Sequence, residues 1–140
     1  MKQQEWPGPV PAIRFDGPTS PMTQDALPRR RLYGRSKGKA LRSHQTELIA
    51  DLLPQLALDL ASPLASRDGR ELRLEIGFGG GEHLAARAAA HPDVGFIGAE
   101  PFVNGVAKLL AHVDEQGLAN VRICDDDARY LLEKLKTSSI

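Results

Sequence analysis

From residue 71 onward, short runs of apolar residues alternate with stretches in which apolar residues recur at helical spacing. The apolar runs predict strands at ELRLEIG (71–77), VGFIGAE (94–100) and NVRIC (120–124). The helical patterns are EHLAARAAAH (82–91), VNGVAKLLAHVDEQG (103–117) and DARYLLEKLK (127–136). Three strand–helix units with short connections predict an α/β fold built on a parallel sheet with right-handed crossovers.

The residues just before this region predict one more helix. In SHQTELIADLLPQLALDL (43–60), apolar residues fall at helical spacing, namely Leu48, Ile49, Leu52 and Leu53. Ser43 is the expected N-cap, and Pro54 is expected to end or kink the helix. Residues 61–70, ASPLASRDGR, have the composition of a linker loop.

The first 42 residues carry no hydrophobic periodicity. Residues 1–28 are rich in proline and polar residues and are expected to be a disordered tail. Residues 29–42, RRRLYGRSKGKALR, form a basic arm without a single acid. The expected organisation is therefore the tail (1–28), the basic arm (29–42), the helix with its linker (43–70) and the α/β domain (71–140).

Charge and cysteine content narrow the possible functions. The net charge is zero, but residues 1–70 carry 11 basic against 7 acidic residues, and residues 71–140 reverse that balance. No secretory signal and no apolar stretch long enough for a membrane span is present, so no membrane association is expected. Cys124 is the one cysteine, and the four histidines show no ligand spacing. A cytoplasmic protein without a bound metal is expected.

The glycine-rich stretch LEIGFGGGEHL (74–84) follows the first predicted strand, where parallel sheets bind ligands. A dinucleotide fingerprint, G-x-G-x-x-G, fails here in both registers, because Glu82 or Leu84 stands where the third glycine belongs. Glu82 at the helix start would also repel a pyrophosphate. A nicotinamide or flavin dinucleotide is therefore disfavoured.

A different pattern, E-x-G-x-G-x-G, fits in full from Glu75 to Gly81. A carboxylate at the end of an apolar strand is expected to meet a cation or several hydrogen-bond donors. S-adenosylmethionine supplies both a positive centre and an ammonium group. Glu100, at the end of the second strand, is placed to accept hydrogen bonds from ribose hydroxyls. The run Asp125–Asp127, after the third strand, could accept from an adenine amino group.

Simpler interpretations exist for each of these features. Glu100 could be a solvated strand end, and one aspartate of the Asp125–Asp127 run could serve as a helix cap. His83 and His112 are expected on helix surfaces, and Cys124 is expected in the core. The basic arm could be a solvated tail. The combination favours a cofactor site, because each acid falls at the end of a predicted strand.

The segments LEIGFGGGEHL, FIGAE, GLANVRI and DDDA, in this order, resemble the bacterial tRNA (guanine-N7-)-methyltransferases. The resemblance covers roughly residues 29–135 and includes the Gly34-Arg35 pair of the basic arm. It implies a Rossmann-like class I methyltransferase fold and S-adenosyl-L-methionine as the cofactor. The implied cofactor-binding residues are Glu75, Glu100 and Asp127, with backbone contacts from Gly77 and Gly79.

The same resemblance implies tRNA as the partner and a guanosine of its variable loop as the methylated base. The N7 atom of guanine carries an in-plane lone pair and no proton, so it can attack the sulfonium methyl without a strong base. Catalysis is then mainly alignment in a water-poor site. The basic arm is expected to hold tRNA phosphates through Arg29, Arg30, Arg31, Arg35, Lys37, Lys39 and Arg42.

The sequence departs from the family after the third predicted helix. The F-P-D-P-W motif that follows in the family has no counterpart, so the chain resembles an N-terminal portion and the catalytic residues are expected beyond Ile140. The 140-residue chain alone is expected to be weakly stable and inactive, with one edge of the first strand exposed. The alternatives are a non-catalytic module that binds S-adenosylmethionine or RNA, and a class I methyltransferase with another substrate.

Overall fold

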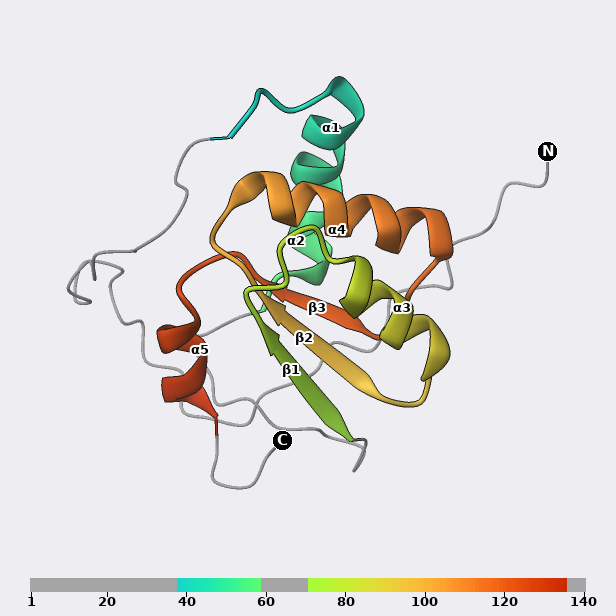
Figure 1. The fold of residues 1–140 in the computed structure, drawn as a ribbon, viewed down its shortest axis with the longest axis vertical. Helices are drawn as coiled ribbons and strands as arrows, with labels where there is room; N and C mark the ends of the chain where they lie inside the picture. Colours follow the sequence, from blue (N-terminus) through green and yellow to red (C-terminus); the bar gives the residue numbers. More distant parts are fainter. Residues whose placement is uncertain (1–37, 59–70, 136–140) are drawn as a thin grey trace.

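The computed structural model describes residues 38–58 and 71–135. It contains a three-stranded parallel sheet in the order β1-β2-β3, with helices on both of its faces (Figure 1). The strands are β1 (Leu72–Ile76), β2 (Gly95–Ala99) and β3 (Val121–Cys124). The helices are α1 (Ser43–Asp51), α2 (Leu53–Leu56), α3 (Glu82–Ala90), α4 (Val103–Gln116) and α5 (Ala128–Lys134).

Each strand and helix predicted from residue 71 onward is confirmed, within a few residues at its ends. The sheet is parallel as expected, with Leu74 of β1 opposite Ile97 of β2, and Ile97 opposite Arg122 of β3. The resemblance to the class I methyltransferase fold is consistent with this order and with one helix between successive strands. The proline-rich tail, residues 29–37 of the basic arm and the whole linker (61–70) lie outside the described residues.

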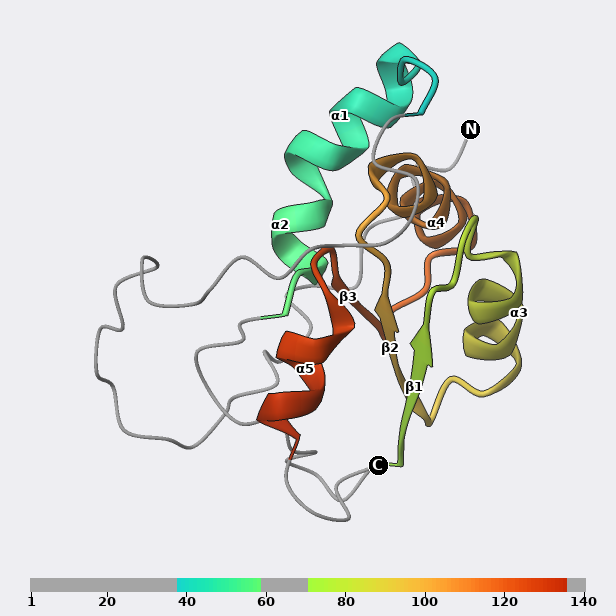
Figure 2. The same ribbon diagram turned by 60° about the vertical axis from the view of Figure 1, so that its left-hand side comes forward.

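Apolar side chains pack on both faces of the central strand β2, which explains why its sequence GFIGA is apolar throughout, whereas LRLEI of the edge strand β1 alternates. Figure 2 shows α3 and α4 over one face and α5 over the other. The larger cluster joins β2 and β3 to the helices α1 to α4 through buried residues that include Phe96, Val121, Leu84, Leu109, Leu110 and Leu48. The smaller cluster packs Leu131 of α5 against Leu72, Ile97 and Cys124.

The helix before the linker begins one residue earlier than the sequence pattern indicates. Ser43 was expected to be the N-cap, but the N-cap is Arg42, whose carbonyl accepts a hydrogen bond from the Thr46 amide over 3.0 Å. The Arg42 amide donates to Oε1 of Gln45 over 3.1 Å, so the glutamine side chain closes the first turn. The break expected at Pro54 is confirmed: α1 ends at Asp51, and Pro54 lies in the first turn of α2.

The turns at the amino-terminal edge of the sheet are held by the side chain of Asn120. Its Nδ2 donates to the carbonyl oxygens of Ala88, His91 and Val94 over 3.0, 2.9 and 2.9 Å. One amide thereby ties the turn between α3 and β2 to the start of β3. At the neighbouring end of α4, Gly117 adopts φ 61° and forms the left-handed C-cap that the sequence predicts.

Within the described residues, β1 pairs only with β2, so its other edge is unpaired. Ile76 at the end of β1 is 53% exposed. This arrangement agrees with the exposed edge expected from the sequence. None of the helices in the described ranges is long and apolar enough to cross a membrane.

Cys124 lies in the smaller core cluster and is 3% exposed, as predicted. Burial raises the pKa of its thiol, and the nearby Asp126 carboxylate adds to this increase. Because alkylation requires the thiolate, iodoacetamide at pH 8 should modify the folded chain at least about ten-fold more slowly than the chain in guanidinium. Mass spectrometry of timed samples measures both rates. Equal rates would contradict the burial of this thiol.

Candidate functional site

The loop between β1 and α3 has a backbone that its glycines make possible. Gly77, Gly79 and Gly81 adopt φ values of 71°, 59° and 78°, a left-handed region that L side chains rarely occupy. A β-carbon placed on Gly77 or Gly79 would meet no atom within 4 Å. These two glycines are therefore required by conformation, and the space beside them is open to a ligand.

Two further glycines fix how closely this loop packs on α4. A β-carbon on Gly81 would lie 2.7 Å from the Leu109 side chain. A β-carbon on Gly105, within α4, would lie only 2.2 Å from the carbonyl oxygen of Gly79. The first turn of α4 can approach the glycine loop only because residue 105 has no side chain.

Glu100 follows β2 directly and links the second strand end to the glycine loop. Its Oε2 accepts a hydrogen bond from the Gly79 amide over 3.1 Å, and its Oε1 accepts from the Phe102 amide over 3.0 Å. Glu100 is thus a partly buried strand end whose carboxylate is held by two backbone amides. Two backbone donors orient this carboxylate beside the open side of the loop.

Glu75 lies one residue before the end of β1, and its side chain is 28% exposed. Its Oε2 lies 3.0 Å from Nδ1 of His83, in the first turn of α3. The sequence predicted a cation or several hydrogen-bond donors beside Glu75. In the structure the neighbouring group is the imidazole of His83, which the sequence predicted only as a residue of the helix surface. His83 is indeed 70% exposed, so both groups remain accessible to a ligand.

Asp127 is the N-cap of α5 and is 7% exposed. Its Oδ1 accepts a hydrogen bond from the Arg129 amide over 2.9 Å, and its Oδ2 pairs with the Arg129 guanidinium. Hydrogen bonding to this carboxylate raises the pKa of Arg129, so the guanidinium stays charged. The capping role considered for one of the three aspartates belongs to Asp127. Its carboxylate therefore already has a cationic neighbour.

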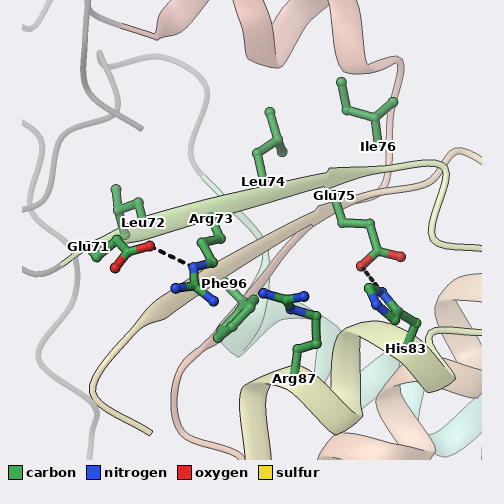
Figure 3. A pocket seen from close by; sticks show the side chains of 9 residues that line it. All are labelled: Glu71, Leu72, Arg73, Leu74, Glu75, Ile76, His83, Arg87 and Phe96. Atoms are coloured by element: carbon green, nitrogen blue, oxygen red, sulfur yellow. Dashed lines mark hydrogen bonds and ion pairs between the residues drawn. The ribbon is translucent and has the colours of Figure 1, made fainter. Parts of the chain in front are cut away.

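An open groove of about 770 Å³ runs along the unpaired edge of β1 (Figure 3). In this view the β1 side chains Arg73 and Glu75 point toward α3, where Arg87 and His83 lie. Leu72, Leu74 and Ile76 point to the opposite face of the sheet. The groove is lined by no glycine of the loop, and it comes nearest to the loop at Ile76 and at the Glu75–His83 pair.

No group of three or more histidine, cysteine, aspartate or glutamate side chains within residues 38–58 and 71–135 could hold a metal ion. The acidic groups at the carboxyl edge of the sheet include Glu75, Glu100 and Asp127, one from each strand end, beside the exposed Asp125 and Asp126. An edge with three carboxylates, a left-handed glycine loop and open space beside it suits a cationic small molecule that also carries hydroxyl or amino donors.

Comparison with known proteins places this site in a family. A family model described as "Putative methyltransferase" matches residues 69–140. The chain belongs to this methyltransferase family. A tRNA (guanine-N(7)-)-methyltransferase of Rhodopseudomonas palustris (strain BisB18) is 54% identical over 114 residues, and one of Agrobacterium fabrum (strain C58) is 55% identical over 115. One of Brucella abortus (strain 2308) is 49% identical over 116 residues. The resemblance to the tRNA (guanine-N7-)-methyltransferases is thus confirmed.

The match covers 76 to 77% of this chain but only 45 to 50% of these three methyltransferases. The chain thus spans about half the length of the relatives it matches. The elements that carry the methyltransferase glycine loop and the three acidic strand ends lie within the region matched by the family model.

The structure brings together some of the residues singled out from the methyltransferase motifs. Glu100 contacts Gly79, whereas Glu75 pairs with His83 and Asp127 with Arg129. Of the basic arm, Lys39 and Arg42 are described, and both are exposed. Arg29, Arg30, Arg31, Arg35 and Lys37 lie outside the described residues. How these residues act on a ligand stays a prediction.

Phe102 and Gly105, which shape the site, were not singled out from the sequence, and neither was Asn104, which contacts the end of the basic arm. A glycine within an otherwise helical pattern indicates close packing, and Gly105 is such a glycine. Phe102 acts through its backbone amide, which no side-chain pattern reveals. Asn104 contacts a residue 65 positions away, so local sequence could not indicate it.

Proposed function

We propose that this chain forms the cofactor-binding region of a tRNA (guanine-N7-)-methyltransferase that uses S-adenosyl-L-methionine and acts in the cytoplasm. The observation that carries the proposal is the Gly79–Glu100 hydrogen bond. It holds an acidic strand end beside a left-handed glycine loop whose outer side is open. The names of the relatives supply the substrate class.

The residues present fit this cofactor. Glu75, accessible at the end of β1, is suited to the ammonium and sulfonium charges, and the open backbone at Gly77 and Gly79 allows close approach. Glu100 is suited to the two ribose hydroxyls, since its carboxylate is already oriented by two amides. Asp127, at the third strand end, is assigned to the adenine amino group by the resemblance, and its carboxylate also caps α5 and pairs with Arg129. We assign these five residues as the cofactor-binding set.

When bound, S-adenosylmethionine supplies an electrophilic methyl group on a positively charged sulfur. The chain's own contribution is alignment, since guanine N7 needs no base to become a nucleophile. Glu75 and Glu100 come from neighbouring strands of a rigid sheet, which limits how far the cofactor can rotate in the site. The basic arm, with Lys39 and Arg42 exposed at its end, is proposed to hold tRNA phosphates.

The test combines cofactor binding with methyl transfer. Calorimetry with S-adenosylhomocysteine should show one site per chain, and Glu75→Ala should weaken it by about ten-fold or more, the equivalent of one charged hydrogen bond. Tritium transfer from labelled S-adenosylmethionine is then measured with two tRNA transcripts, for the chain alone and for the chain extended by C-terminal sequence. One contains guanosine, and the other contains 7-deazaguanosine, which has a C–H group in place of N7.

Transfer to the guanosine transcript alone would support methylation at N7. Equal transfer to both transcripts would contradict the proposed N7 position. Cofactor binding without transfer is the expected result for the 140-residue chain alone. If transfer were still absent after C-terminal sequence is added, the alternative would be favoured, a non-catalytic module that binds S-adenosylmethionine or RNA. Glu71→Ala is the matched control for Glu75→Ala, because Glu71 is an exposed carboxylate that precedes β1 at the opposite edge of the sheet.

A further inference from the structure

The first turn of α4 contacts the end of the basic arm as well as the glycine loop. Nδ2 of Asn104 donates a hydrogen bond to the carbonyl oxygen of Lys39 over 2.7 Å. The two residues are 65 positions apart in the chain. This bond crosses from α4 to the segment that precedes α1, so it fixes where the basic arm enters the folded domain.

Gly38 packs directly against the same asparagine. A β-carbon at residue 38 would lie 2.0 Å from Oδ1 of Asn104 and 2.7 Å from Cζ of Phe102. Its φ lies outside the left-handed region, so any residue could adopt this backbone conformation. A side chain at residue 38 would have to displace the ends of the Asn104 and Phe102 side chains, so glycine permits this close contact.

The other side of this turn is part of the cofactor site. The Phe102 amide donates to Oε1 of Glu100, and Gly105 packs on the Gly79 carbonyl. The segment from Glu100 to Gly105 therefore holds the basic arm on one side and the glycine loop on the other. A shift of the arm at residue 38 would press on the same turn that orients Glu100.

We propose that Asn104 is a positioning residue that anchors the basic arm at the rim of the cofactor site. The anchor places the exposed cations Lys39 and Arg42 for tRNA phosphates close to the methyl donor. Neither side chain has an ion pair within the described residues, so both are available to an anionic partner. The tRNA part of this inference rests on the proposed function, whereas the anchor itself does not.

Limited digestion with trypsin tests the anchor without any ligand. Trypsin cleaves after Lys39 by binding the carbonyl that accepts the Asn104 hydrogen bond, so this bond must open before cleavage. In Asn104→Ala, cleavage after Lys39 should accelerate about three- to ten-fold, the equivalent of one hydrogen bond. Mass spectrometry of timed samples gives this rate. Cleavage after Arg87, within α3, reports unfolding of the domain and should not change.

Two further variants complete the digestion experiment. Gly38→Ala leaves α4 intact but forces the arm away from Asn104, so it should accelerate the same cleavage even if Asn104→Ala folds poorly. Gln116→Ala removes an exposed amide from the other end of α4 and should leave the rate unchanged. If the rate of cleavage after Lys39 were unchanged in both Asn104→Ala and Gly38→Ala, the proposed anchoring by Asn104 would be overturned. An equal acceleration after Lys39 and Arg87 would also overturn it, since the asparagine would then only support the fold.

Binding of a tRNA transcript tests the consequence for the partner. Asn104→Ala should weaken tRNA binding about three-fold or more while keeping the salt dependence, because the phosphate-binding cations remain but lose their placement. Lys39→Ala should instead reduce the slope of log affinity against log salt by about one. Both variants should retain the S-adenosylhomocysteine affinity of the unmodified chain.

The outcomes separate the two proposals. If the unmodified chain fails to bind S-adenosylhomocysteine, the proposed cofactor site fails, whereas the digestion result still decides the anchor. If the unmodified chain binds no tRNA, or if Asn104→Ala binds tRNA with unchanged affinity, the positioning role is overturned. A loss of cofactor affinity in Asn104→Ala equal to its loss of tRNA affinity would assign the residue to the cofactor site instead.

Discussion

Glu100→Ala should reduce the affinity of the chain for S-adenosylhomocysteine by at least about 100-fold, because two charged hydrogen bonds to ribose are lost. The substitution also removes the acceptor for the Gly79 and Phe102 amides, so the glycine loop loses its link to β2. Isothermal titration calorimetry measures the change directly. Under the proposed function, the Glu100 carboxylate both binds the ribose and holds the glycine loop.

Two further variants test how far the loss of affinity depends on the charge of Glu100 and on its position. Glu100→Gln keeps the shape and one oxygen acceptor but not the charge, so we expect an affinity between those of the unmodified chain and Glu100→Ala. Glu115→Ala removes an exposed carboxylate near the end of α4 and should bind normally. If Glu100→Ala bound S-adenosylhomocysteine as tightly as Glu115→Ala does, Glu100 would not be a cofactor residue.

Gly105→Ala is expected to have the largest effect on stability among the glycine substitutions at this site. Its methyl group would lie 2.2 Å from the Gly79 carbonyl oxygen, which belongs to the backbone and cannot move away as a flexible side chain could. We expect the free energy of unfolding to fall by about 1–3 kcal/mol, as for other overpacked positions. The affinity for S-adenosylhomocysteine should fall with it, because relief of the clash displaces the glycine loop.

Gly117→Ala provides the matched control for this substitution. Gly117 lies at the other end of α4 and has φ 61°, and a β-carbon at this position would meet no atom within 4 Å. Its replacement should therefore cost stability through backbone strain alone, about 1 kcal/mol, without altering cofactor affinity. Urea unfolding and calorimetry on both variants give the comparison. If both variants retained full cofactor affinity, Gly105 would not control the position of the loop.

The order and type of the elements could be predicted because local patterns determined them. β2 is a short apolar run, and β1 alternates apolar and polar residues, which is also a strand pattern. α4 carries buried residues at helical spacing from Val106 to Val113. Pro54 and Gly117 marked a helix break and a helix end through backbone conformation alone. The N-cap was misplaced by one residue, because Ser43 has the preferred side chain but Gln45 closes the turn from inside the helix.

The candidate site could be predicted only in part. Glycines that need a left-handed backbone and acids at strand ends are visible in the sequence, so Gly77, Gly79, Glu75 and Glu100 could be proposed as one site. Their actual partners could not be predicted, since they depend on tertiary packing. The Glu75–His83 pair spans a strand and a helix, and the contact of Asn104 with Lys39 joins segments 65 residues apart.

The hydrogen bonds from the Asn120 side-chain amide to three backbone carbonyl oxygens have a practical consequence for spectroscopy. They immobilise the turn that contains the exposed Asp93, at the edge of the sheet opposite the glycine loop. Since Cys124 is buried, a cysteine introduced as Asp93→Cys would be the reactive thiol of the chain. A fluorophore attached there would rotate with the whole domain, so its anisotropy would report the slower tumbling of a tRNA complex rather than local motion.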